Sequence, residues 1–135
     1  MSPSAVSTVD PGRAKVHRPV RDGVAMVCAA SAGVHAALVP AHLQEGPLIG
    51  AAFGLSVLLL AAAALGVRTS PGPAYRIAAV LLGVSGCYLL SRTTGIPLLI
   101  PEPEPVDVLG TVTSLAEVAA AVAVLGLPRT RKEPR

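Results

Sequence analysis

Two histidines and a glutamate form the short stretch with the most reactive side chains. His35, His42 and Glu45 lie at positions i, i+7 and i+10, so one continuous helix would carry all three on one face. Imidazole and carboxylate groups bind Zn²⁺ or Cu²⁺ and also relay protons. The pattern therefore predicts a divalent-metal site at His35, His42 and Glu45, or a site that binds protons.

Pro40 and the spacing argue against a single metal ion. Histidines seven residues apart are separated by two helical turns, about 10 Å. Proline inside a helix breaks or kinks it, so Pro40 would have to bend the chain before both rings could reach one ion. The stretch also matches no defined metal motif. Metal and proton binding therefore remain alternatives.

Glu117 is the second chemical feature, because it lies deep within an apolar run. A carboxylate at that depth in a membrane costs on the order of 2.5–3.5 kcal/mol on insertion scales. It should therefore face other helices and have a polar partner. Polar residues recur at helical spacing around it and in two other runs. These rows are Asp107, Thr111, Ser114 and Glu117; Cys28, Ser31, His35 and His42; and Ser85, Tyr88 and Arg92.

These rows predict a shared polar site. His35 and Glu117 have similar depths in runs that neighbour each other in a bundle, so we predict that they touch. The contact would be a functional pair or a structural interhelical hydrogen bond. The further polar candidates inside or at the rim of the bundle are Asp107, Arg92, Ser114 and Tyr88.

The elements that position these residues are apolar runs. Hydrophobic residues make up 52% of the 135-residue chain and charged residues 14%, whereas about a quarter is usual in soluble domains. The runs span 23–43, 48–67, 74–91 and 106–127. Each is near the ~20 residues that cross a ~30 Å hydrocarbon core. The chain is therefore predicted to be an integral membrane protein in contact with the lipid bilayer.

Four runs with short connectors predict an all-α, antiparallel up-down bundle. Residues 22–127 would form this transmembrane domain. Residues 1–21 are expected to be a disordered cytoplasmic tail, and residues 128–135 a basic one. The Pro-Glu segment at 101–105 would be a stiff spacer over the bundle mouth.

Basic residues predict the orientation. Of the eleven Lys and Arg residues, all but Arg92 lie on one side of a four-span protein. The positive-inside bias makes that side cytoplasmic, so both termini should be cytoplasmic in a plasma-membrane protein. The histidine stretch then lies at the extracytoplasmic end.

Other functions find little support in the residues. No aromatic interleaving or nucleic-acid motif accompanies the +3 net charge, so nucleic-acid binding is not expected. Cys28 and Cys87 lie at different depths and are predicted to be free, apolar core residues. No nucleophile elbow, P-loop or HExxH motif is present.

Three segments carry a resemblance: HAALVPAHLQEGPLIGAAF, YLLSRTTGIP and EPVDVLGTVTSLAE. They resemble small multi-span membrane proteins of high-GC actinobacteria. The resemblance covers residues 22–127 and implies the membrane location but no activity.

The sequence thus predicts a membrane protein with a polar site for an ion or proton. The alternative is a structural accessory subunit that associates with itself or another membrane protein through small-residue faces such as Gly50-x3-Gly54. A membrane-embedded enzyme is the third possibility.

Overall fold

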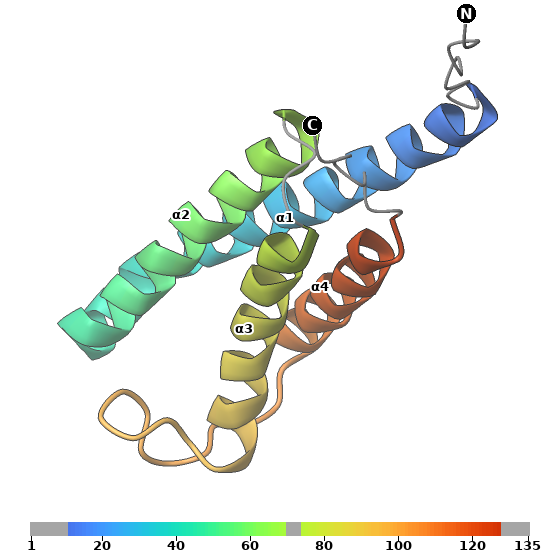
Figure 1. Ribbon diagram of the computed structural model, residues 1–135. Helices are drawn as coiled ribbons and strands as arrows, with labels where there is room; N and C mark the ends of the chain where they lie inside the picture. The colour runs from blue at the N-terminus through green and yellow to red at the C-terminus, as the bar shows by residue number, and fades with distance from the viewer. Residues whose placement is uncertain (1–10, 70–73, 128–135) are drawn as a thin grey trace, which may run out of the picture.

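Four helices make up almost all of the described structure. The computed structural model describes residues 11–69 and 74–127, and Figure 1 shows their arrangement. The helices are α1 (Pro11–Glu45), α2 (Pro47–Thr69), α3 (Ala74–Thr93) and α4 (Val108–Leu125). Within the described ranges, the β pairing consists of one isolated bridge, between Ile96 and Ile100. The predicted all-α, four-helix fold is confirmed.

Local sequence explains where the helices begin. α1 and α2 both begin at proline. Proline is favoured at the first helical position because it has no backbone N–H, and an N–H at that position would have no acceptor within the helix. Asp107 caps α4, and its carboxylate accepts a hydrogen bond from the Gly110 backbone N–H at 2.6 Å. The cap places the start of α4 at Val108, two residues after the predicted start.

The first helix is longer than predicted. Residues 11–21 are helical, although we expected them to belong to a disordered tail. Ala, Lys and Arg are good helix formers, and extending an existing helix needs no new nucleation. The remaining parts of the predicted tails, 1–10 and 128–135, lie outside the described residues.

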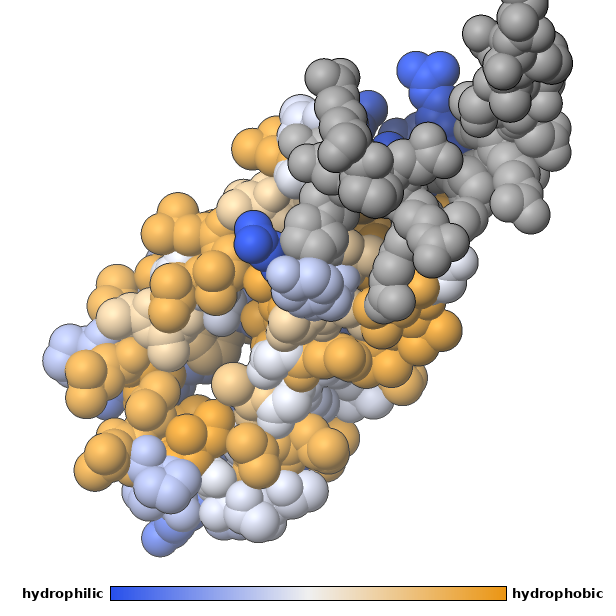
Figure 2. All heavy atoms as spheres, viewed as in Figure 1, coloured by the Kyte–Doolittle hydropathy of each residue, from blue (hydrophilic) through white to orange (hydrophobic). Residues whose placement is uncertain are grey.

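All four helices are long and apolar enough to cross a membrane. Large apolar side chains such as Leu58, Leu65, Leu89 and Val122 are exposed on their outer faces. Figure 2 shows apolar residues over most of the visible helical surface. In water this surface would be unfavourable, but in lipid it is the expected exterior. The architecture is that of a multi-pass membrane protein.

The helices pack as two hairpins. α1 has its most extensive contact with α2, and α3 with α4; α1 also packs on α4, and α2 on α3. In the view of Figure 1 the hairpins lie close at the start of α3 and diverge toward its end. The bundle therefore has a closed end, where α1 and α3 begin their spans, and an open end, where they finish.

The buried apolar core lies at the closed end. Leu60 and Leu81 are fully buried there, together with Cys28 and Ala121. Alanine supplies many of the side chains in this cluster, and such small side chains let the four helices approach closely. Its members are Val24, Ala25, Cys28, Ala32, Leu60, Ala63, Val67, Ile77, Ala78, Leu81, Ala120, Ala121 and Val124.

A compact loop follows α3 at the open end. Ile96 and Ile100 exchange backbone hydrogen bonds of 2.6 and 2.8 Å, which closes a tight turn. Gly95 enters the turn with φ of +73°, a conformation that glycine adopts without steric cost. The Glu104 backbone N–H then bonds to the Ser91 carbonyl at 2.9 Å and returns the chain to α3. The loop therefore folds back on the end of α3 as an ordered segment.

Gly50 lies in the contact between α1 and α2. A Cβ at Gly50 would lie 2.3 Å from the Leu43 side chain of α1, whereas one at Gly54 would meet nothing within 4 Å. Gly50 is buried, so it serves the α1–α2 contact and does not contribute to an outward face for self-association. The small-residue face predicted at Gly50 and Gly54 is therefore wrong for Gly50.

Candidate functional site

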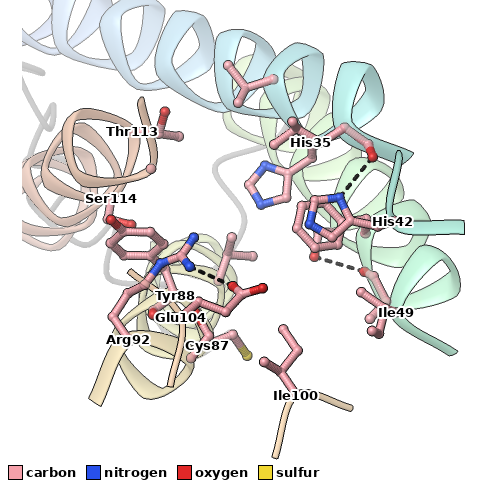
Figure 3. Close-up of a pocket in the computed structure, with 18 of the residues that line it drawn as sticks. His35, His42, Ile49, Cys87, Tyr88, Arg92, Ile100, Glu104, Thr113 and Ser114 are labelled. Carbon is pink, nitrogen blue, oxygen red and sulfur yellow. Dashed lines mark hydrogen bonds and ion pairs between the residues drawn. The ribbon is translucent and has the colours of Figure 1, made fainter. Parts of the chain in front are cut away.

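A cavity of about 480 Å³ lies at the open end, between the two hairpins. All four helices and the loop line it. Figure 3 shows His35 and His42 on one side and Tyr88, Arg92 and Ser114 on the other. The volume is in the range of sites for small organic molecules. Of the predicted site residues, those that line this one cavity are His35, His42, Tyr88, Arg92, Asp107, Ser114 and Glu117, whereas Glu45 does not line it.

Glu117 forms the floor of this cavity. Its side chain is 1% exposed, and it lies where the apolar core ends and the cavity begins. Ser31 of α1 donates a hydrogen bond to Oε1, and Ser85 of α3 donates one to Oε2 at 2.7 Å. Glu117 is on α4, so its carboxylate joins three helices. Within the described ranges no basic side chain forms an ion pair with it.

The hydroxyl groups suit either protonation state of Glu117. When Glu117 is ionised, both serines donate to it. When Oε2 carries a proton, it can donate to Ser85 Oγ, which lies 3.3 Å from the Ser114 carbonyl and can donate there instead. Serine hydroxyls rotate and serve as donor and acceptor. A proton can therefore bind without leaving a buried polar group unpaired.

Ser31 connects Glu117 to His35. The Nδ1 atom of His35 lies 2.9 Å from the Ser31 carbonyl oxygen and 3.4 Å from Ser31 Oγ. With a proton on Nδ1, the imidazole donates to the Ser31 carbonyl oxygen and lies at the longer distance from the Ser31 hydroxyl, which donates to Glu117 Oε1. The hydrogen bonds of the described residues include no direct His35–Glu117 bond. The predicted pair is therefore corrected to a triad in which Ser31 is central, because a serine one turn before His35 is nearer to α4.

His42 is held by its own helix and by Phe53. Its Nδ1 atom lies 2.9 Å from the Leu38 carbonyl, and its ring stacks on Phe53 of α2 with centroids 3.7 Å apart. Phe53 also contacts the His35 ring, at 5.5 Å. Both histidines thus use Nδ1 toward a backbone carbonyl, which leaves Nε2 with the lone pair in the neutral ring.

Pro40 does not end the helix. α1 continues through Pro40 to Glu45, so of the two predicted alternatives, a break or a kink between the histidines, the break is wrong. The helix tolerates the missing backbone hydrogen bond because packing against α2 supports this segment. Glu45 lies 4.0 Å from His42 Nε2, with half of its side chain exposed.

The described geometry does not assemble a metal site. No group of three or more His, Cys, Asp or Glu side chains in residues 18–69 and 74–127 is placed to hold one ion. His35 and His42 remain two turns apart on one continuous helix, each beside Phe53. A metal site at His35, His42 and Glu45 stays a prediction that these positions do not support.

Arg92 organises the rim of the cavity. Its Nη1 donates to Glu104 at 2.6 Å and its Nη2 donates to Asp107 at 2.9 Å. The guanidinium carbon also lies 5.0 Å from the centre of the Tyr88 ring. Only 17% of the Arg92 side chain is exposed, and its Nε atom is buried without a hydrogen-bond partner. Arg92 thus ties the loop and the start of α4 to α3.

Tyr88 supports the same corner. Its hydroxyl lies 2.9 Å from Thr111 Oγ1 and 3.1 Å from the Asp107 carbonyl. The ring packs directly on Gly110, where a Cβ would lie 2.3 Å from Tyr88 Cε2. A larger residue at position 110 would displace the ring. Tyr88 and Arg92 were predicted as rim residues and lie there.

Four site residues differ from the prediction. Phe53 was not predicted, because α2 has no polar row to mark an inward face. Ser31 and Ser85 lie in the predicted polar rows but were not among the predicted site residues. Cys87 was expected in the core, but it is exposed and lines the cavity, whereas Cys28 is buried; both are free. A side chain on a helix facing a cavity is not distinguishable by spacing from one facing the core.

Comparison with known proteins adds no function. No protein-family model matches the chain, and neither a curated protein nor a solved structure shows significant similarity to it. The resemblance drawn from the three segments therefore stays a prediction.

Proposed function

We propose that this membrane protein binds a proton at Glu117, on the floor of the cavity. The observation that carries the proposal is the buried carboxylate between two serine hydroxyls, one on α1 and one on α3. An uncompensated charge in a low-dielectric interior is costly. A proton removes that charge, and the hydrogen-bond network accepts it when the Ser85 hydroxyl turns from Glu117 to the Ser114 carbonyl.

His35 supplies a path for the proton. It lines the cavity and contacts Ser31, which bonds to Glu117. Chains of imidazole, hydroxyl and carboxyl groups relay protons in membrane proteins. Cys28 on α1 interacts with Glu117 electrostatically. The other titratable groups that line the cavity with Glu117 are His42 on α1, Cys87, Tyr88 and Arg92 on α3, and Glu104 and Asp107 at the rim. The lining residues from α2 carry no titratable group.

The cavity is proposed to open on the extracytoplasmic side of the plasma membrane. The support is the distribution of basic residues: Arg18, Arg21, Arg68 and Arg76 lie at the closed end, and Arg92 lies at the open end. The positive-inside bias then makes the closed end cytoplasmic. Labelling of single cysteines placed at Glu45 and at Arg68 with a membrane-impermeant reagent on whole cells tests this, with Glu45→Cys expected to react.

Infrared difference spectroscopy between acidic and alkaline buffer tests proton binding. Each carboxyl that gains a proton contributes a carbonyl stretching band. In the purified full-length protein we expect one band that disappears in Glu117→Gln. The same band should shift in Ser85→Ala, because the hydroxyl next to Oε2 is removed.

Glu102→Gln is the matched control, because Glu102 is exposed on the loop and does not line the cavity. It should remove a band that Ser85→Ala does not shift. If the spectra of Glu117→Gln and the wild type are the same, Glu117 does not change protonation. The carboxyl is then a structural link between helices, and the accessory-subunit alternative gains support.

A further inference from the structure

The cavity carries a net negative charge. Three carboxylates line it, those of Glu104, Asp107 and Glu117, against one guanidinium, that of Arg92. With neutral histidines the formal sum is −2. Charges that line a cavity with low-dielectric walls create a strong local potential. The cavity therefore favours positively charged molecules.

Arg92 is not available to an anion. Both of its terminal nitrogens are already bonded to carboxylates, at 2.6 and 2.9 Å, and its face is covered by Tyr88. The histidines also present no donor in their neutral form, since Nδ1 of each faces a backbone carbonyl. An anionic ligand would thus meet more carboxylates than guanidinium groups, and the one Arg92 nitrogen without a hydrogen-bond partner, Nε, is buried.

Most of the remaining cavity wall is apolar. Val34 and Leu38 contribute from α1, Ile49 and Phe53 from α2, and Ile100 from the loop. Phe53 stacks on His42 with one face and adds its apolar ring to this wall. A small, strongly hydrated ion would gain little from such walls, whereas an organic cation with apolar substituents would bury them.

We propose that the cavity binds a lipophilic organic cation whose charge is balanced by Glu117. The inference rests on the proposed proton binding, because the cation and the proton neutralise the same carboxylate. They therefore compete, and each weakens the other's binding, as linkage requires. The size of the cavity, about 480 Å³, admits a molecule of drug-like size.

Tetraphenylphosphonium is a suitable probe, and tetraphenylborate is the control of the same shape and opposite charge. Titration calorimetry on the purified full-length protein in detergent should show saturable binding of the phosphonium and none of the borate. Lowering the pH should weaken phosphonium binding. The cation should also slow alkylation of Cys87 by N-ethylmaleimide, because Cys87 lines the cavity.

Two variants test the contributions of the Glu117 charge and of the Phe53 ring to phosphonium binding. Glu117→Gln should weaken phosphonium binding about tenfold or more, since opposite charges attract strongly at the effective dielectric of a protein interior. Glu102→Gln should bind like the wild type. Phe53→Ala should weaken binding about threefold or more, because apolar surface that would cover the ligand is lost. Circular dichroism and gel filtration confirm that each variant is folded.

Several results would overturn the inference. Equal binding of phosphonium and borate would show that apolar walls alone attract the probe. Binding that does not change with pH or with Glu117→Gln would separate the cation from Glu117. Absence of phosphonium binding would overturn the inference while the infrared band of Glu117 still supports proton binding. Loss of that band would instead contradict the proposed function itself.

Discussion

Ser85 Oγ lies 2.7 Å from Glu117 Oε2 and joins α3 to α4 at the boundary between core and cavity. Ser31 makes the equivalent bond from α1 to the other carboxylate oxygen. The two hairpins are thus linked at a single carboxyl group. From Glu117 toward the open end the hairpins separate and line the cavity. From Glu117 toward the closed end they pack together in the apolar core.

Loss of the serine hydroxyls should destabilise the protein. Ser31→Ala and Ser85→Ala should each cost about 0.5–2 kcal/mol, the usual range for interhelical hydrogen bonds in membranes. The double variant should cost more than the sum, because Glu117 then has no donor. Thermal unfolding in detergent measures this. Ser56→Ala is the control, since Ser56 bonds within its own helix, and an equal loss there would contradict the prediction.

Arg92 should hold the loop in place. Arg92→Lys keeps the charge but cannot donate to Glu104 and Asp107 in the same fork geometry. The expected loss of stability is small, about 1 kcal/mol, because both acidic partners are partly exposed. Hydrogen exchange of the backbone in residues 94–107 should accelerate, while exchange in α2 should not. Unchanged exchange in the loop would argue that the Ile96–Ile100 turn alone orders it.

Gly95 should not tolerate a side chain. In Gly95→Ala the Cβ would lie 2.6 Å from the Ile100 carbonyl oxygen and 2.7 Å from that of Pro101, and φ of +73° adds strain. The left-handed conformation alone costs about 1–2 kcal/mol. The melting temperature should fall, and the loop should exchange faster. Gly86→Ala is the control, because nothing lies within 4 Å of its Cβ; a similar fall there would contradict the structural explanation.

The two cysteines should differ in reactivity. Cys87 is exposed on the cavity wall and Cys28 is buried in the core. N-ethylmaleimide should therefore add once to the native protein and twice after denaturation, as measured by mass spectrometry. Cys87→Ser should abolish the native reaction. Rapid alkylation of Cys28 in the native protein would contradict the closed packing at that end of the bundle.

Much of the fold follows from the sequence alone. Four apolar runs separated by Pro- and Gly-containing connectors fix the number of helices, because each run matches one bilayer crossing. Glu117 was also recognisable, since a carboxylate in such a run must face protein. The same reasoning placed His35, Arg92 and Asp107 near the open end of the bundle.

Only the tertiary structure decided which of these groups meet. Helical spacing gives the face of each helix but not its rotation or tilt against neighbours, so His35 and Glu117 were predicted to touch although Ser31 lies between them. Phe53 and Cys87 line the cavity because the two hairpins diverge toward the open end. That divergence depends on how the side chains pack at the closed end, far along the chain from either residue. The sequence thus determined that a buried carboxyl exists, and packing determined its partners.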